Sequence, residues 1–236
     1  MLPKRVLQIF VPCFLMLCLL AACSSGTGTS SASSAPRAQT PTVAVTPSAK
    51  VAAGTLLFQA NLSQGLAGWS GTQGWTVVQG QLEVNSSSSA ALAIPYKPVV
   101  SNYAIEIRLQ VVRLLQDHGG NFVFAAAKQN GKDGYQAGVL DLKKPGPFGS
   151  HPQAQATINP NDDMPMGCCQ PIDYEPGYDW HTYRLEVQDN GVRLLDDGTQ
   201  IAHADSNVTA RLSNGPLSLD STLVILRVSS LRILAL

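Results

Sequence analysis

Residues 103–111 read Tyr-Ala-Ile-Glu-Ile-Arg-Leu-Gln-Val, and this stretch gives the clearest strand signal in the chain. Large apolar side chains occupy every second position, and Ala, Glu, Arg and Gln fill the positions between them. This alternation is the period of a β-strand that buries one face and exposes the other to water. The stretch therefore predicts a half-buried strand over Tyr103–Val111.

The same period recurs over most of the chain from Thr55 onward, and no window of a dozen residues carries a helical stripe. Gly80 and the Asp197-Gly198 pair stand between such segments, where residues that accept positive φ favour hairpin turns. About a dozen short strands predict an all-β fold, a two-sheet antiparallel β-sandwich or jelly roll. The further expected strands are Trp75–Gln79, Gln81–Asn85, Asn121–Lys128, Tyr135–Leu142, Gln153–Ile158, Trp180–Gln188, Val192–Leu195, Gln200–Ala204, Leu223–Val228 and Leu231–Leu236.

One long segment, Lys143–Asp179, interrupts this rhythm and is rich in Pro and Gly. A loop of this length with little regular structure is usually functional or disordered. Its aromatic residues, among them Tyr174 and Tyr178, favour a functional loop.

The N-terminus is typical of an export signal. Lys4 and Arg5 precede an apolar run over Val6–Leu20, which Pro12 interrupts and which is too short to span a bilayer comfortably. The following Leu20-Ala21-Ala22-Cys23 resembles the lipobox of bacterial lipoproteins. That resemblance implies a signal peptide over residues 1–22 and a lipid (diacylglycerol, then palmitate or a similar acyl chain) on Cys23. An ordinary secretory signal with an accidental cysteine is the alternative.

Residues 23–53 form the expected tether, because this Ser-, Thr-, Pro- and Ala-rich segment has almost nothing to bury. Residues 54–236 are then one domain, large enough for a sizeable core. The expected location is extracytoplasmic, on a bacterial membrane to which the lipid on Cys23 attaches the chain.

Charge argues against a nucleic-acid partner. The whole chain is formally neutral, but four of its sixteen basic residues precede the domain, and all sixteen acidic residues lie inside it. The domain is therefore mildly acidic, and it shows no basic stripe or interleaved aromatic and basic residues. Contact with the membrane is expected through the lipid alone.

Cys168 and Cys169 are the only thiols of the domain, and they are adjacent in the sequence. An exported protein can form disulfides, but adjacent Cα atoms lie only about 3.8 Å apart, so a vicinal bridge is strained. The alternatives are two free thiols or one bridge to another molecule. Two cysteines are too few for a structural zinc site, so no metal ligand is assigned.

A family resemblance follows from several short motifs. They are Gly74-Trp75-Thr76-Val77, Gly80-Gln81-Leu82, Gly134-Tyr135-Gln136-Ala137-Gly138-Val139-Leu140-Asp141, Trp180-His181-Thr182-Tyr183-Arg184-Leu185 and Gly215-Pro216-Leu217-Ser218-Leu219. In this order they resemble the concanavalin A-like lectin/glucanase superfamily, and most closely its 3-keto-disaccharide hydrolase type of domain. The resemblance implies a concanavalin A-like sandwich and a carbohydrate ligand.

Catalytic signatures are missing or altered. Gln136 stands where that family often has Glu, and the Glu-x-Asp-x-x-Glu pattern of family 16 glucanases is absent. Glycoside hydrolysis needs two carboxyls at a fixed separation. The strand-borne acids Glu83, Glu106, Asp141 and Glu186 are not paired at i, i+2, and each is expected to be an ordinary surface carboxylate. Asp141 is the catalytic candidate, because it matches the family position and precedes the long loop.

Sugars are bound by aromatic faces and by planar polar groups that pair with hydroxyls. Outward residues of the expected strands supply the planar groups, and the aromatic residues around the long loop supply the platform. The predicted binding residues are Arg108, Gln136, Asp141, Tyr174, Tyr178, Trp180 and His181. For His181 a structural role at the start of its strand is the alternative.

No cofactor is expected. Asn159-Pro160-Asn161-Asp162-Asp163 offers oxygens to Ca²⁺ but lacks the spacing of a known calcium loop.

Three functions remain open. The first is a membrane-anchored lipoprotein whose domain binds a carbohydrate or polysaccharide without turning it over. The second, which the resemblance implies, is a glycoside hydrolase or lyase acting on 3-keto-glycosides. The third is a structural or protein-interaction lipoprotein, since one sandwich fold hosts many functions.

Overall fold

The structure is a computed structural model that describes residues 51–85, 88–116, 119–142, 151–159, 171–207 and 211–236. All of these residues belong to one compact unit, Ser48–Leu236. Within this described part, no helix is long and apolar enough to cross a membrane.

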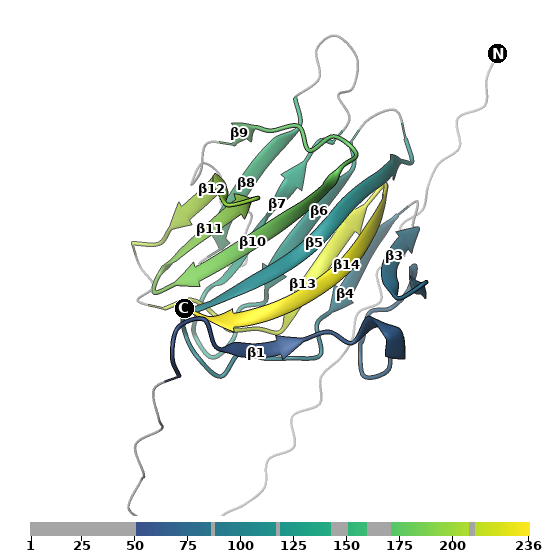
Figure 1. The fold of residues 1–236 in the computed structure, drawn as a ribbon. Helices are drawn as coiled ribbons and strands as arrows, with labels where there is room; N and C mark the ends of the chain where they lie inside the picture. The colour runs from purple at the N-terminus through teal and green to yellow at the C-terminus, as the bar shows by residue number, and fades with distance from the viewer. Residues whose placement is uncertain (1–50, 86–87, 117–118, 143–150, 160–170, 208–210) are drawn as a thin grey trace, which may run out of the picture. The chain divides into compact units, whose positions relative to one another are not determined.

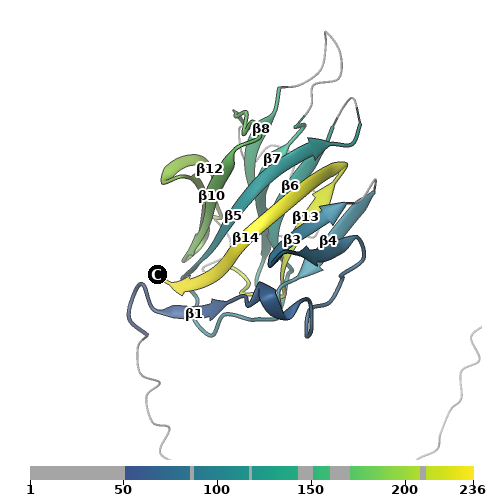
Figure 2. The same ribbon diagram turned by 45° about the vertical axis from the view of Figure 1, so that its right-hand side comes forward.

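Two antiparallel sheets lie face to face, as Figures 1 and 2 show from two directions. The larger, sheet A, has the order β12-β11-β10-β5-β14-β3-β2, and β1 also pairs with β14. Its strands are β1 (Leu56–Gln59), β2 (Trp75–Val78), β3 (Gln81–Asn85), β5 (Tyr103–Leu114), β10 (Trp180–Gln188), β11 (Gly191–Asp196), β12 (Thr199–Asp205) and β14 (Val224–Ala235).

The smaller sheet B has the order β4-β13-β6-β7-β8-β9. Its strands are β4 (Ser89–Ala93), β6 (Asn121–Ala126), β7 (Gly134–Leu140), β8 (Gln153–Asn159), β9 (Ile172–Asp173) and β13 (Leu217–Thr222). One short 3-10 helix, η1 (Leu62–Gln64), is the only helix in the described ranges. The predicted all-β, two-sheet antiparallel sandwich is therefore confirmed.

The core forms between the inner faces of the two sheets. Alternate residues of β5, from Tyr103 to Leu109, are at most 1 % exposed. Phe122 from β6 meets Tyr183 from β10 edge to face, with ring centroids 5.0 Å apart. Since successive side chains on a strand point to opposite faces, this packing fixes which residues of each strand point outward.

Two buried tyrosines join the sheets at one end of the core. The hydroxyls of Tyr103 on β5 and Tyr135 on β7 lie 2.5 Å apart, and Tyr103 also donates to the carbonyl of Ser213. Burial raises the pKa of both phenols above the ordinary value of 10.0. Both hydroxyls therefore stay protonated, and the hydrogen bonds satisfy them inside the core.

Most expected strands exist, but some expectations were wrong. The two expected strands at the C-terminus, Leu223–Val228 and Leu231–Leu236, form one strand, β14, whose pairing with β5 shifts register between Val228 and Ser230. Four strands were not expected: β1, β4, β9 and β13. Strand β9 lies inside the segment Lys143–Asp179 that was expected to be a loop, which also contains the predicted strand β8.

Candidate functional site

A cleft of about 580 Å³ opens on the outer face of sheet B. Strands β4, β6, β7 and β13 form it together with the adjoining loops. Its lining consists of Ala93, Ala125, Ala126, Ala127, Lys128, Gly134, Tyr135, Gln136, Pro216, Leu217 and Ser218. Among the residues that the structure describes, Lys128 is the only charged one in this lining, so the cleft fits an uncharged polar ligand better than a strongly charged one.

The strand register explains why this face is hollow. Ser218 on β13 pairs with Ala93 on one side and with Ala125 on the other, and Ala125 pairs in turn with Gln136 on β7. Residues directly opposite on neighbouring strands point to the same face. Two alanines and a serine thus make a low floor, and the longer Gln136 side chain stands beside it.

A second row of outward residues runs across the same strands next to the first. Asp220 pairs with Ala91 and with Val123, Val123 pairs with Gly138, and Gly138 pairs with Gln155 on β8. Gln155 and Gly138 line a second, smaller hollow that shares Gln136 with the cleft. The two rows therefore lie side by side on the outer face of sheet B, and Gln136 lines both hollows.

Glycine at 138 keeps that floor low. A Cβ at this position would lie 2.1 Å from the carbonyl oxygen of Phe122 on β6, and no residue other than glycine fits without moving a strand. A glycine inside a strand often marks such a close approach of two backbones.

Asp220 is the carboxyl of this surface. Burial raises its pKa above the ordinary value of 3.8, and a hydrogen bond with Ser218 opposes the rise. Its Oδ1 is buried and has no hydrogen-bond partner. The same holds for the hydroxyl of Thr157 on β8, the residue that pairs with Gln136 on β7. Both atoms are buried, so a ligand in the cleft reaches them only if neighbouring side chains move.

Of the predicted binding residues, only Gln136 lies in the cleft. Asp141 follows the other end of β7 with a φ of +52°, five residues beyond Gln136. At about 3.3 Å per residue, Asp141 therefore lies roughly 16 Å from Gln136 along the strand.

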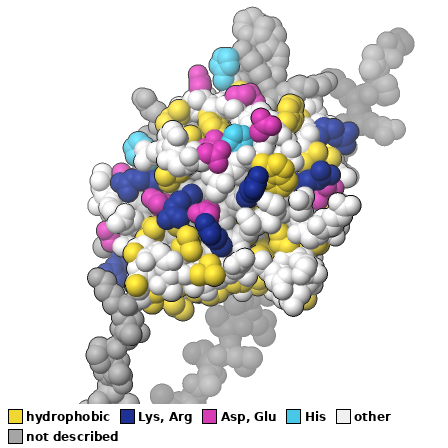
Figure 3. Space-filling view, in the orientation of Figure 1, with side chains coloured by type: hydrophobic (Ala, Val, Ile, Leu, Met, Phe, Trp, Pro, Cys, Tyr) yellow, Lys and Arg dark blue, Asp and Glu magenta, His cyan; other side chains and the backbone are white. Residues whose placement is uncertain are grey.

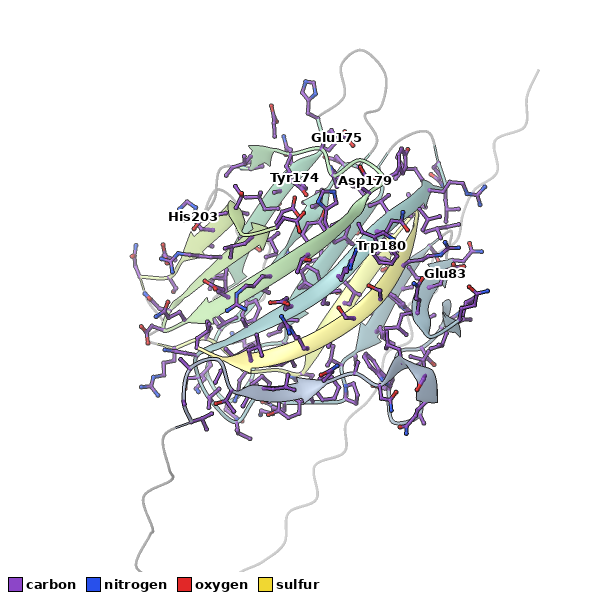
Figure 4. All side chains as sticks on the ribbon, viewed as in Figure 1. Glu83, Tyr174, Glu175, Asp179, Trp180 and His203 are labelled. Atoms are coloured by element: carbon purple, nitrogen blue, oxygen red, sulfur yellow. The ribbon has the colours of Figure 1, made fainter. Side chains whose placement is uncertain are left out.

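Arg108 and Trp180 lie on the opposite side of the sandwich, on the outer face of sheet A. The Arg108 guanidinium carbon is 5.7 Å from the centre of the Trp180 ring, the geometry of a cation–π contact. Figure 4 shows Trp180 over this face. The structure therefore does not bring these two residues together with Gln136.

The strand-borne acids Glu83, Glu106 and Glu186 also belong to the outer face of sheet A. Arg227 donates to Glu83, Arg184 to Glu106 and Glu186, and Arg232 also to Glu106. Figure 3 shows the resulting mixture of basic and acidic side chains on this face. Glu83, Glu106 and Glu186 are thus surface ion-pair partners, as their sequence pattern suggested.

Tyr174, Tyr178 and His181 lie where the chain passes from β9 of sheet B into β10 of sheet A. Tyr174 donates to Asp196 Oδ2 at 2.7 Å, and its hydroxyl lies 3.0 Å from that of Tyr183. Burial, followed by these two contacts, raises the pKa of Tyr174 well above its ordinary value. Tyr174 is thus held by its neighbours, whereas the side chain of Tyr178 is 60 % exposed.

Ser218, Asp220 and Thr157 were not among the predicted site residues, although Ser218 belongs to one of the family motifs. The alternation of Leu217-Ser218-Leu219-Asp220 carries the same period-two signal as β5 and could have identified the first two as outward neighbours. Cys23, Cys168, Cys169 and residues 160–163 of the possible calcium segment lie outside the described residues.

Comparison with solved structures gives the fold class. An endo-acting O-glycanase structure from work on the human gut microbiota and mucin breakdown has a TM-score of 0.55 at 11 % identity, covering 77 % of this chain and 100 % of that one. An immunostimulatory antigen and pseudo beta-1,3-glucanase of Mycobacterium tuberculosis gives 0.54 at 9 %, covering 78 % and 100 %. A family 16 glycosyl hydrolase protein of Mycobacterium smegmatis gives 0.51 at 10 %, covering 76 % and 100 %. These similarities confirm the concanavalin A-like sandwich.

No curated protein matches the chain. The sequence profile of one family does match, over residues 55–223, which include both rows of the cleft surface. The predicted family resemblance is therefore confirmed, and the chain belongs to the family described as the 3-keto-alpha-glucoside-1,2-lyase-like domain.

Proposed function

We propose that this protein is an extracytoplasmic, lipid-anchored carbohydrate-binding protein, and that its ligand binds in the cleft on the outer face of sheet B. The observation that carries the proposal is the cleft itself, with a floor of small side chains flanked by amide and hydroxyl groups. The family and the fold, which the glycanase and glucanase structures share, support a sugar as the ligand.

The chemistry of the cleft suits a neutral sugar. Gln136 offers both a donor and an acceptor, and Ser218 offers a hydroxyl that can act as either. A polysaccharide presents many hydroxyls and few charges, so a few placed polar groups above an otherwise apolar floor suffice to orient it. The described lining residues carry no charge beyond that of Lys128.

Glycan-array binding tests this proposal. The full chain in detergent is expected to bind at least one glycan class on the array. Gln136→Ala is expected to weaken that binding about tenfold, because it removes hydrogen bonding worth roughly 1.4 kcal/mol. Gln200→Ala is the matched control, because Gln200 is an exposed residue of β12 in the other sheet. Retention of no glycan, or equal losses in both variants, would contradict the proposal.

A second candidate function is a lyase or hydrolase acting on 3-keto-glycosides in the same cleft. It is favoured by the family description and by Asp220 beside the cleft, because burial raises the pKa of this carboxyl, which is the direction that a general acid needs. A carbonyl at C3 acidifies the hydrogen on C2, so elimination of the group on C1 needs one base and one acid. Asp220 does not line the cleft, but it lies in the row of residues beside it and is the candidate acid there.

Product release from 3-keto-disaccharides separates the two functions. Turnover by the full chain that Asp220→Asn removes and Asp141→Asn leaves intact would establish the enzyme and place its acid on sheet B. Binding of the same sugars without product would leave the binding function. Loss through Asp141→Asn alone would move the chemistry to the other end of β7.

A further inference from the structure

We propose that His181, Asp196 and Asp197 form a binding site for one divalent transition-metal ion, of which Zn²⁺ is the best fit. The three residues come from the start of β10, the end of β11 and the turn that follows β11. One ligand atom from each lies within 4.8 Å of the others. These elements belong to sheet A, whereas the cleft lies on sheet B, so the site is separate from the cleft.

The imidazole of His181 is oriented by its Nε2 atom. This nitrogen lies 2.9 Å from the carbonyl oxygen of Pro176, which can only accept a hydrogen bond. Nε2 therefore carries the proton, and in the neutral ring the lone pair is on Nδ1. A histidine that binds a metal through one ring nitrogen usually donates the N–H of its other ring nitrogen to such an acceptor.

The free nitrogen faces two carboxylates. Nδ1 of His181 lies 3.0 Å from Asp196 Oδ1 and 3.2 Å from Asp197 Oδ2. Three atoms with lone pairs or negative charge thus converge on one point. A positive charge between them is needed to offset their mutual repulsion.

The hydrogen-bonding pattern favours a metal ion over a proton as that charge. A proton on Nδ1 can satisfy Asp197 Oδ2, which is aligned for a hydrogen bond. Asp196 Oδ1 would still be a buried oxygen without a hydrogen-bond partner, although Nδ1 is close to it. A metal ion accepts all three ligands at once, whereas one proton leaves that oxygen unsatisfied.

Each ligand is also fixed from behind. Tyr174 donates to the other oxygen of Asp196, and the backbone N–H of Thr182 donates to the other oxygen of Asp197 at 2.9 Å. With the Pro176 contact, all three ligands have a supporting hydrogen bond that leaves the converging atom available. Such outer partners orient the ligands and commonly change metal affinity by 10- to 100-fold.

Ligand type and spacing point to zinc. Ligand atoms about 2.0–2.2 Å from a tetrahedral Zn²⁺ lie roughly 3.3–3.6 Å apart, so the two distances from Nδ1 need to change by only a few tenths of an ångström. The histidine nitrogen disfavours Ca²⁺ and Mg²⁺, which take oxygen ligands. The Asp197 side chain is 56 % exposed, which leaves room for water as a fourth ligand.

Metal binding would join the segment that precedes β10 to the hairpin of β11 and β12. Tyr174 and Pro176 contact the ligands from that segment, and Asp196 and Asp197 belong to the hairpin. The ion would therefore stabilise the conformation of residues 174–180.

Isothermal titration of Zn²⁺ into the EDTA-treated full chain in detergent, with its thiols alkylated, tests the proposal. We expect one Zn²⁺ per chain, a rise in Tm that EDTA reverses, and no such rise with Ca²⁺. Asp196→Asn should abolish binding, and Tyr174→Phe, which keeps all three ligands, should weaken it about tenfold.

His203→Gln is the matched control, because His203 is an exposed histidine on β12, apart from Tyr174 in Figure 4. It should bind Zn²⁺ as the unchanged chain does. The proposal is wrong if the unchanged chain binds no Zn²⁺, or if folded Asp196→Asn protein, checked by circular dichroism, binds as tightly as the unchanged chain. Equal losses in His203→Gln and Tyr174→Phe would also overturn it.

Discussion

Asp220 sits on an exposed sheet face, yet its carboxyl is desolvated. Its neighbours across the strands are Ala91 and Val123, which offer no hydrogen bonds, and Ser218 is the one group that stabilises its charge. Burial disfavours the charged form of a carboxyl, so the balance raises the pKa. A binding face thus carries an acid that is more easily protonated than an ordinary surface aspartate.

This shift predicts a pH-dependent stability. The folded-state pKa of Asp220 lies above its unfolded value, so ionisation is penalised in the folded state, and the stability falls as the pH rises from 3.8 through the folded pKa. Asp220→Asn removes the penalty. The difference in Tm between Asp220→Asn and the unchanged chain should therefore increase in favour of the variant between pH 4 and pH 7.

Asp205→Asn is the control, because Asp205 is an exposed residue of β12. Its Tm should follow the unchanged chain across the pH range. A difference between Asp220→Asn and the unchanged chain that stays constant with pH would show that the carboxyl titrates at its ordinary value.

Among the elements, the strands with strict alternation could be predicted from the sequence, and those without it could not. Strand β10 was predicted with both of its ends correct, and the prediction for β5 missed only its last three residues, 112–114. Strand β4 reads Ser-Ala-Ala-Leu-Ala, and its small residues give little contrast between the two faces. In β14 the two serines at 229 and 230 interrupt the apolar alternation, so the sequence predicted two strands. The pairing with β5 shifts register at this point, and one strand continues through the serines.

The candidate site was harder to predict than the strands, for a topological reason. Alternation shows which residues share one face of a strand, but it does not show which sheet the strand joins. Arg108 and Gln136 are both outward residues of well-predicted strands, yet β5 belongs to sheet A and β7 to sheet B. The predicted ligand set therefore mixed residues from the two outer faces.

The contact between β6 and β7 gives a prediction at the element scale. In Gly138→Ala the new Cβ meets the carbonyl oxygen of Phe122, so the strands must separate. We expect a loss of about 1–3 kcal/mol or more, the range for overpacking, in urea unfolding followed by tryptophan fluorescence.

Gly198→Ala separates this steric effect from backbone strain. Gly198 has a φ of +87° in the β11–β12 turn and no atom within 4 Å of an added Cβ, so only the left-handed conformation opposes the change. Its cost should be about 1–2 kcal/mol. Full stability of Gly138→Ala would mean that the two strands are further apart than described.

For the whole molecule, the two outer faces of the sandwich carry different chemistry. The outer face of sheet A presents arginines paired with glutamates. The His181 cluster lies at the ends of β10 and β11, where His181 and Asp196 pair with the core residues Leu109 and Tyr183. Sheet B presents a polar cleft over a floor of small side chains. The two proposed sites are therefore separate, the sugar site on the outer face of sheet B and the ion site at the ends of β10 and β11.

The proposed lipid anchor is also a whole-molecule property. Cys23→Ser removes the thiol that would carry the lipid, so the chain should move from the detergent-extracted membrane fraction to the soluble fraction on cell fractionation. Cys18→Ser, in the expected signal peptide, should leave the chain in the membrane fraction. Equal fractionation of the two variants would contradict lipid attachment at Cys23.

Binding of a retained glycan to three versions of the full chain is the most direct test of the assignment of the ligand to sheet B. Ala125→Leu fills the floor of the cleft without entering the core, and Arg108→Ala removes the cation beside Trp180 on the opposite face. We predict that Ala125→Leu abolishes binding and that Arg108→Ala binds like the unchanged chain. Normal binding by Ala125→Leu, together with a loss in Arg108→Ala, would place the ligand on sheet A and contradict the account.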